Sequence, residues 1–106
     1  MKHIQPDEWK EVLNNEGSVG NLVMTDNKLE IVHLSLEKGA EIPLHALPID
    51  VYFFVIEGTP SFLTDENETQ CKENDVVFCP ANKMRSWKNN DNKTSKILVT
   101  KSMVEK

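Results

Sequence analysis

The chain has 106 residues, of which 39% are hydrophobic and 27% are charged, so its composition is that of one ordinary globular domain. The formal net charge of −5 argues against nucleic acid as a partner, and no apolar run approaches the length needed to span a membrane. The N-terminus lacks the apolar core of a signal peptide, and we therefore expect a cytoplasmic protein. In that compartment Cys71 and Cys79 are expected to be free thiols.

A short helix is predicted near the N-terminus, over residues 5–13. Pro6 suits the first turn of a helix, because a backbone N–H at that position has no partner within the helix in any case. Trp9, Val12 and Leu13 have the i, i+3, i+4 spacing of an apolar helical face. We expect this face to pack on the core and assign it no functional role.

From Ser18 onward the apolar period changes to two, which is typical of β-strands. Short extended segments separated by turn residues are predicted over residues 21–25, 29–36, 40–45, 51–56, 61–64, 69–71, 76–79, 83–88 and 94–100. In the second of these segments, Glu30 shares one face with three aliphatic side chains, whereas His33 lies on the other face. This regular spacing predicts an all-β sandwich or barrel, followed by a tail, residues 103–106, that we expect to fray.

The stretch from Gly39 to Gly58 contains six consecutive apolar residues, 51–56. A strand without polar alternation is expected to be covered on both faces, by the core on one side and by a second subunit on the other. We therefore predict a homodimer that buries Phe54, on a surface that also includes Tyr52 and Ile56.

Gly39, His45 and Gly58 stand at the intervals of a known motif. That motif reads glycine, five residues, His-x-His, three or four residues, an acid or another ligand, six residues and glycine. It is the first of the two short motifs of the cupin family, which this sequence resembles.

The second cupin motif reads glycine, five residues, Pro-x-Gly, two residues, His, three residues and Asn. Pro80 and Asn89 are in register with it. Asn74 and Asn82 occupy its glycine positions, and asparagine is the commonest non-glycine residue to tolerate the left-handed backbone conformation. The resemblance spans residues 29–100 and is closest to the small single-domain cupins of the conserved-barrel type.

The resemblance implies an all-β jelly-roll barrel over residues 18–102, preceded by an N-terminal segment, residues 1–16, that carries the short helix. Residues 1–106 would then form a single cupin domain. Small cupins often dimerise through the outer face of the central sheet, so the resemblance also implies the homodimer.

In metal-binding cupins four side chains hold the ion. Their positions correspond here to His45, Leu47, Val51 and Arg85. Leucine and valine cannot bind a metal, and the fixed positive charge of arginine repels a cation, so these degenerate positions imply neither a metal nor another cofactor. His33, Cys79 or Asp50 could rebuild a metal site around His45 only if their side chains faced the barrel interior.

We therefore predict a metal-free barrel that binds a small molecule. Its pocket is predicted to be lined by His45, Leu47, Val51, Phe53, Phe78, Arg85 and Trp87. An arginine that points into a small barrel must be paired or must await an anionic ligand such as a carboxylate. Two structural alternatives for Arg85 are an ion pair with Asp50 or Glu57, and a side chain that extends to the barrel mouth beside a core Trp87.

The alternative function is a cupin enzyme of the dioxygenase or isomerase type, metal-dependent or metal-free, with a rearranged site around His45. The sequence contains no recognisable nucleophile–base pair and no phosphate loop, so we assign no catalytic residue. Whether the protein is an enzyme is left open at this point.

Overall fold

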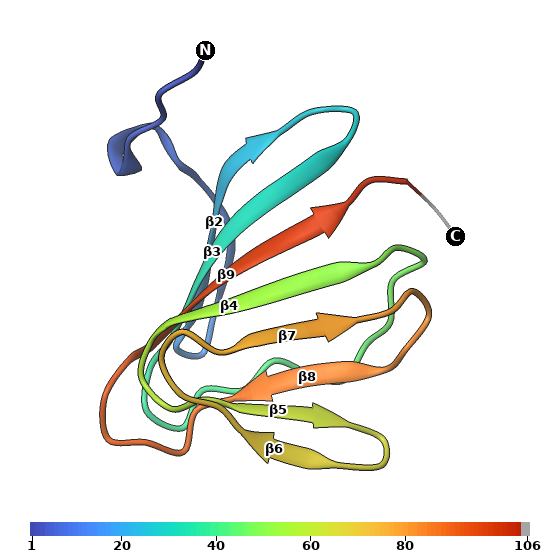
Figure 1. Cartoon of the computed structure of the whole chain (residues 1–106). Coiled ribbons are helices and arrows are strands. Elements are labelled where there is room, and N and C mark those ends of the chain that lie inside the picture. Colours follow the sequence, from blue (N-terminus) through green and yellow to red (C-terminus); the bar gives the residue numbers. More distant parts are fainter. Residues whose placement is uncertain (105–106) are drawn as a thin grey trace.

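A computed structural model describes residues 1–104 as an all-β jelly roll built from two antiparallel sheets (Figure 1). Glu105 and Lys106, the end of the predicted tail, lie outside the described residues. The larger sheet has the strand order β1 (Lys10–Asn15), β2 (Ser18–Thr25), β3 (Leu29–Leu36), β9 (Ser95–Ser102), β4 (Val51–Glu57) and β7 (Val76–Cys79). The smaller sheet has the order β6 (Glu68–Gln70), β5 (Ser61–Thr64) and β8 (Arg85–Lys88). No helix in residues 1–104 is long and apolar enough to cross a membrane.

The predicted N-terminal helix is wrong. Only Pro6–Glu8 forms a turn of 3-10 helix, and β1 follows it directly. β1 pairs with β2 through a two-residue turn at Glu16 and Gly17, whose φ angles are +48° and +89°. An isolated short helix is marginal in water, whereas in the hairpin the backbone of this segment is paired with β2.

Alternation between the two faces of the larger sheet places the core. The predicted faces of β3 are confirmed, because Val32, Leu34 and Leu36 are buried and the residues between them are not. The buried hydrophobic residues of β4 and β9 continue this inner face, and they are Val51, Phe53, Val55, Ile97 and Val99. The inner face meets the smaller sheet through an aromatic cluster, in which the ring centroids of Phe53, Phe62 and Trp87 lie 5.0–5.6 Å apart.

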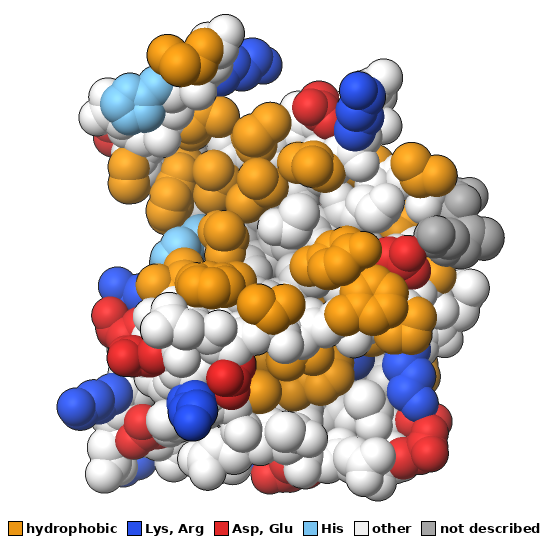
Figure 2. Space-filling model, viewed as in Figure 1, with side chains coloured by type: hydrophobic (Ala, Val, Ile, Leu, Met, Phe, Trp, Pro, Cys, Tyr) orange, Lys and Arg blue, Asp and Glu red, His pale blue; other side chains and the backbone are white. Residues whose placement is uncertain are grey.

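The outer face of β4 and β7 is apolar. Figure 2 shows hydrophobic side chains gathered over these two strands. The exposed residues among them are Tyr52, Phe54, Ile56, Val76 and Phe78. β4 was predicted to be covered on both faces. Within one chain, only its inner face is covered.

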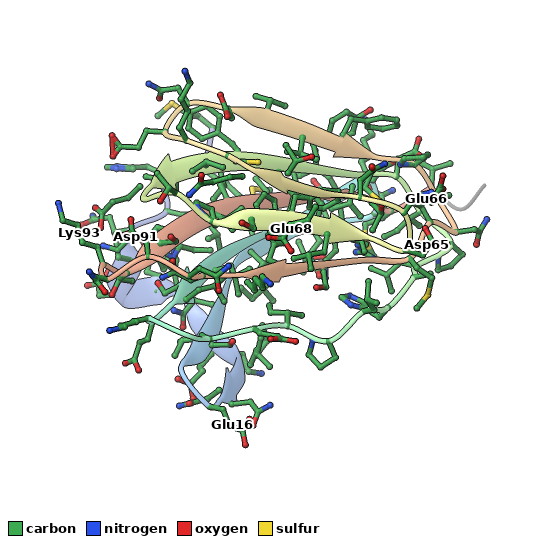
Figure 3. All side chains as sticks on the ribbon, turned by 90° about the horizontal axis from the view of Figure 1, so that it is seen from below. Glu16, Asp65, Glu66, Glu68, Asp91 and Lys93 are labelled. Atoms are coloured by element: carbon green, nitrogen blue, oxygen red, sulfur yellow. The ribbon has the colours of Figure 1, made fainter. Side chains whose placement is uncertain are left out.

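Charged side chains lie in the loops at both ends of the barrel. Figure 3 shows Asp65 and Glu66 at one end, and Asp91 and Lys93 at the other. At the first end, Lys83 forms ion pairs with both carboxylates, at 3.4 Å and 2.8 Å. These acids are therefore occupied by a lysine that lies outside the barrel interior.

Three asparagines support the loops at the positions expected from the second cupin motif. Asn74 and Asn82 have φ angles of +75° and +68°, which confirms that they replace glycine in the left-handed conformation. The side chain of Asn89 is fully buried, and its Nδ2 donates to the carbonyls of Leu36 (2.9 Å) and Lys93 (2.7 Å). Asn89 thus ties the end of β3 to the loop before β9.

At Gly58 both the backbone conformation and the lack of space exclude a side chain. Its φ is +87°, and a methyl group there would lie 2.5 Å from Ser95 Oγ and 2.9 Å from Ser95 Cα. Gly39 has a similar φ of +80° but open space around it.

We expect Gly58→Ala to lower the free energy of unfolding by about 2–5 kcal/mol, and Gly39→Ala by about 1–2 kcal/mol, because only the first adds a clash to the backbone strain. Urea denaturation of both variants measures this, and equal losses would contradict the clash.

Candidate functional site

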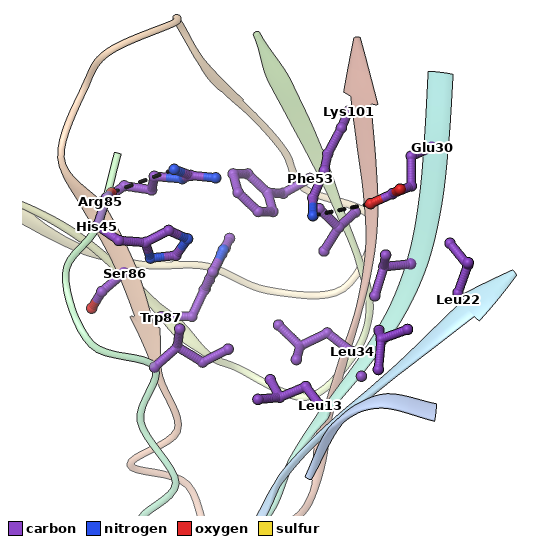
Figure 4. Close-up of a pocket in the computed structure, with 15 residues that line it drawn as sticks. Leu13, Leu22, Glu30, Leu34, His45, Phe53, Arg85, Ser86, Trp87 and Lys101 are labelled. Carbon is purple, nitrogen blue, oxygen red and sulfur yellow. Dashed lines mark hydrogen bonds and ion pairs between the residues drawn. The ribbon is translucent and has the colours of Figure 1, made fainter. Parts of the chain in front are cut away.

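A cavity of about 430 Å³ lies inside the barrel (Figure 4). β8 and the segment before β4 form one wall, and β1, β2, β3 and β9 form the other. Most of its lining is apolar, and the aliphatic and aromatic side chains include Leu13, Leu22, Val32, Leu34, Phe53 and Val99. The polar groups are few, which is the usual construction of a small-molecule site.

Backbone pairing places His45 and Arg85 side by side. His45 N donates to Arg85 O at 3.0 Å, and Arg85 N donates to His45 O at 2.9 Å. Further along, Ile42 N donates to Trp87 O at 2.8 Å, so residues 40–45 lie along β8 as an additional extended segment. Residues that face each other in an antiparallel pair project to the same side, and Figure 4 shows both side chains pointing into the cavity.

Arg85 is a buried cation without an acidic partner among residues 1–104. Its side chain lines the cavity although the residue is only 4% exposed, and no carboxylate of residues 1–104 forms an ion pair with it. One terminal nitrogen lies 3.4 Å from His45 O, and Nε has no hydrogen-bond partner in the described chain. Burial lowers the pKa of Arg85, but a guanidinium stays protonated at neutral pH. The predicted alternatives of a pair with Asp50 or Glu57 are not among its contacts.

Trp87, two residues further along β8, supplies a second N–H. Its Nε1 is buried and has no hydrogen-bond partner among residues 1–104. The ring packs edge-on against Phe53 at a centroid distance of 5.4 Å, so its position is fixed by the core. Arg85 Nε and Trp87 Nε1 are therefore N–H groups on the same strand that are buried and have no partner among residues 1–104.

His45 is exposed and lines the cavity at its opening. Its Nδ1 lies 3.0 Å from Pro43 O. A carbonyl oxygen can only accept, so this bond places the proton of the neutral ring on Nδ1 and leaves Nε2 as an acceptor. The backbone of the loop therefore orients the imidazole ring.

An ion pair faces these groups from the opposite wall. Lys101 Nζ lies 3.3 Å from Glu30 Oε2, and the two side chains are about one quarter exposed. They are direct cross-strand neighbours on β9 and β3, on the same faces as Val99 and Val32 (Figure 4). The positive charge of Lys101 and the negative charge of Glu30 therefore neutralise each other on this wall.

Four of the seven predicted pocket residues line the cavity: His45, Phe53, Arg85 and Trp87. Val51, at 1% exposed, is packed in the core, and Leu47 is packed against the core. Phe78 points to the outer face of the sheet, where its ring lies 5.0 Å from that of Tyr52. In β7 it is the neighbouring residue, Cys79, that is buried.

Neither His33 nor Cys79 joins His45. His33 lies on the outer face of β3, stacked on Trp9 at a centroid distance of 4.9 Å. Burial raises the pKa of the Cys79 thiol, whose Sγ contacts backbone carbonyls outside the cavity lining. In residues 1–104, no group of three or more His, Cys, Asp or Glu side chains could hold a metal ion. The residues at the four ligand positions of a metal-binding cupin therefore do not fit a metal, since only His45 among them is a donor.

The second wall of the cavity was not predicted from the sequence. It comes from Leu13, Gly20, Leu22, Glu30 and Lys101, together with the β3 and β9 core residues. Glu30 and Lys101 each continue an alternating apolar face by two residues, and this signal was available. The β1 residues carried no such signal, because their spacing also fits a helix.

The sequence model of the cupin domain matches residues 32–101. The match covers well over half of the chain, and the chain therefore belongs to the cupin family. No curated protein matches the sequence significantly.

Solved structures of cupins share the whole fold. An RmlC-like cupin from Shewanella frigidimarina is 18% identical, with 98% of this chain and 93% of that chain covered and a TM-score of 0.84. The polyketide cyclase RemF from Streptomyces resistomycificus is 12% identical, with coverages of 99% and 81% and a TM-score of 0.84. A sugar phosphate isomerase of the cupin superfamily from Silicibacter pomeroyi is 16% identical, with coverages of 97% and 76% and a TM-score of 0.81. At these identities the likeness shows the fold alone.

The unpaired guanidinium should cost stability when no ligand is bound. We expect Arg85→Met, which keeps the bulk and removes the charge, to raise the free energy of unfolding by about 1–3 kcal/mol. His45 O still accepts from the backbone N–H of residue 85 in this variant, so no new unpaired group is created. Urea denaturation in buffer free of carboxylates measures the change, and Lys38→Met, at an exposed position, serves as the control with an expected change within about 0.5 kcal/mol. A loss of stability in Arg85→Met would show that the charge is already compensated.

Proposed function

We propose that this cupin is a metal-free barrel that binds a small molecule through an anionic group held by Arg85. The observation that carries the proposal is a buried guanidinium that lines a cavity and has no acidic partner within residues 1–104. A buried charge without a partner is unfavourable, and an anionic ligand would supply the missing partner.

A carboxylate suits the donors of this wall. The planar fork of arginine matches the two oxygens of a carboxylate, and the side chain of Arg85 lines the cavity. The apolar neighbours lower the local dielectric, and a hydrogen bond to a charged group contributes roughly 1.5–3 kcal/mol. No step of the proposal requires a metal ion, because His45 is the only metal donor at the family's ligand positions.

A second candidate function is a metal-free enzyme in which His45 exchanges a proton with the bound molecule. The specific observation in its favour is the bond from Nδ1 to Pro43 O, which orients the ring and leaves Nε2 free to accept a proton at the cavity opening. Solved structures with this fold include proteins named as a cyclase and an isomerase, so the fold is compatible with catalysis.

Anion binding is tested by a thermal-shift screen of small carboxylates and sugar phosphates. We expect at least one anion to raise the melting temperature of the wild-type protein, and Arg85→Met to abolish the shift. The shift should persist in protein freed of metal ions, with the chelator removed beforehand, because no metal takes part. If no anion stabilises the wild type, or if the same compounds stabilise Arg85→Met, Arg85 has a structural role only.

The apolar outer face of β4 and β7 is the second element of the proposal, as the surface of a homodimer. Five large apolar side chains are 39–64% exposed on these two neighbouring strands. A contiguous exposed patch of this kind is typical of an interface, and a second copy of the same face is equally apolar. The inner face of β4 carries the cavity wall at Phe53, so the interface would support the site from behind.

Analytical ultracentrifugation at micromolar concentration tests the dimer. We expect the wild type to sediment as a dimer and Phe54→Asp as a monomer, because the carboxylate would be buried at the interface. Leu44→Asp is the control, since Leu44 is also an exposed apolar residue but lies on the segment beside β8. A monomeric wild type would refute the proposed interface.

A further inference from the structure

We infer that the ligand is a monocarboxylate with a hydrocarbon body, aromatic or branched, and not a sugar acid, a sugar phosphate or a dicarboxylate. The inference rests on the proposed anion site at Arg85. It follows from the unequal chemistry of the two cavity walls. One wall carries the Arg85 guanidinium, which has no acidic partner among residues 1–104, and the other carries aliphatic side chains and the Glu30–Lys101 ion pair.

The wall opposite Arg85 is built for an apolar body. Leu13, Leu22, Val32, Leu34 and Val99 line it, and none of these side chains can accept or donate a hydrogen bond. A hydroxyl group placed against them would lose its bonds to water without replacement, at a cost on the order of tenfold in affinity for each group. A polyhydroxy body would therefore bind poorly, whereas a hydrocarbon body would gain from leaving water.

The Glu30–Lys101 pair excludes a second anionic group. Lys101 is the other cation that lines the cavity, but Glu30 already occupies it at 3.3 Å. A second carboxylate on the ligand would have to displace Glu30 and would then be repelled by it. Because Glu30 and Lys101 are direct cross-strand partners, the backbone register holds them together.

The volume of the cavity sets the size of the body. Gly20 lines the cavity, and a methyl group at position 20 would meet Leu13 Cβ at 3.2 Å and Val32 Cγ1 at 3.6 Å. A cavity of about 430 Å³ lies near the lower end of the range for small-molecule sites. Ligands with one ring or a short branched chain are therefore the appropriate probes.

Isothermal titration calorimetry of the full-length protein tests the inference with six compounds. Phenylacetate and 4-methylpentanoate carry a hydrocarbon body, gluconate and glucose 6-phosphate carry hydroxyl groups, and glutarate and adipate carry a second carboxylate. We expect the first two to bind at least tenfold more tightly than the other four. Arg85→Met should weaken phenylacetate at least tenfold, and Arg85→Lys should retain part of the affinity.

Two variants test the role of the ion pair. Glu30→Gln releases Lys101, and we expect the affinity of adipate relative to 4-methylpentanoate to rise at least fivefold. Lys101→Met leaves Glu30 as the remaining charge and should lower the same ratio. The ratio is measured within each variant, so a general loss of stability does not imitate the result.

The results of these titrations distinguish a failure of this inference from a failure of the proposed function. If gluconate, glucose 6-phosphate or a dicarboxylate binds as tightly as phenylacetate and requires Arg85, the inference is overturned and the anion site stands. If no compound binds, or if Arg85→Met binds as well as the wild type, the anion site fails and the inference fails with it. An unchanged ratio in both ion-pair variants would overturn the role of Glu30 and Lys101.

Discussion

The reciprocal backbone bonds between His45 and Arg85 are the constraint on which the site depends. They hold the segment before β4 against β8, close one side of the cavity, and direct an imidazole and a guanidinium to the same side. The arrangement uses backbone groups only, so it does not require particular side chains at either position. The jelly roll can therefore keep the geometry of a cupin site while its chemistry changes from metal ligands to a fixed cation.

Arg85 illustrates the conflict between stability and function in a small core. Arg85 has no acidic partner among residues 1–104, and it lies beside Phe53 and Trp87, which pack the two sheets together. A neutral side chain would suit this core better, and for this reason we propose an anionic ligand as the partner of the charge. The Glu30–Lys101 pair shows the opposite arrangement, in which both charges are supplied by neighbouring strands.

Much of the fold could be predicted from the sequence because strand periodicity and turn residues agree over most of the chain. The segments 29–36, 61–64 and 76–79 begin and end where the prediction placed them. The N-terminal strand was not predicted, because Trp9, Val12 and Leu13 fit two periods and only pairing with β2 decides between them. For the site, motif spacing identified the wall with His45 and Arg85, whereas the opposite wall depends on how distant strands pack. Phe78 was placed in the pocket because motif spacing does not reveal side-chain parity in a short strand.

One wall of the cavity is provided by β1, which lies at the edge of the larger sheet and pairs with β2 alone. Its register is interrupted between Glu11 and Leu13, so its ladder is also irregular. A strand with one neighbour separates at a lower free energy than a strand held on both sides. The interior thus has a second route to solvent, besides the opening at His45, because local opening of this hairpin would expose the cavity while the central strands stay paired.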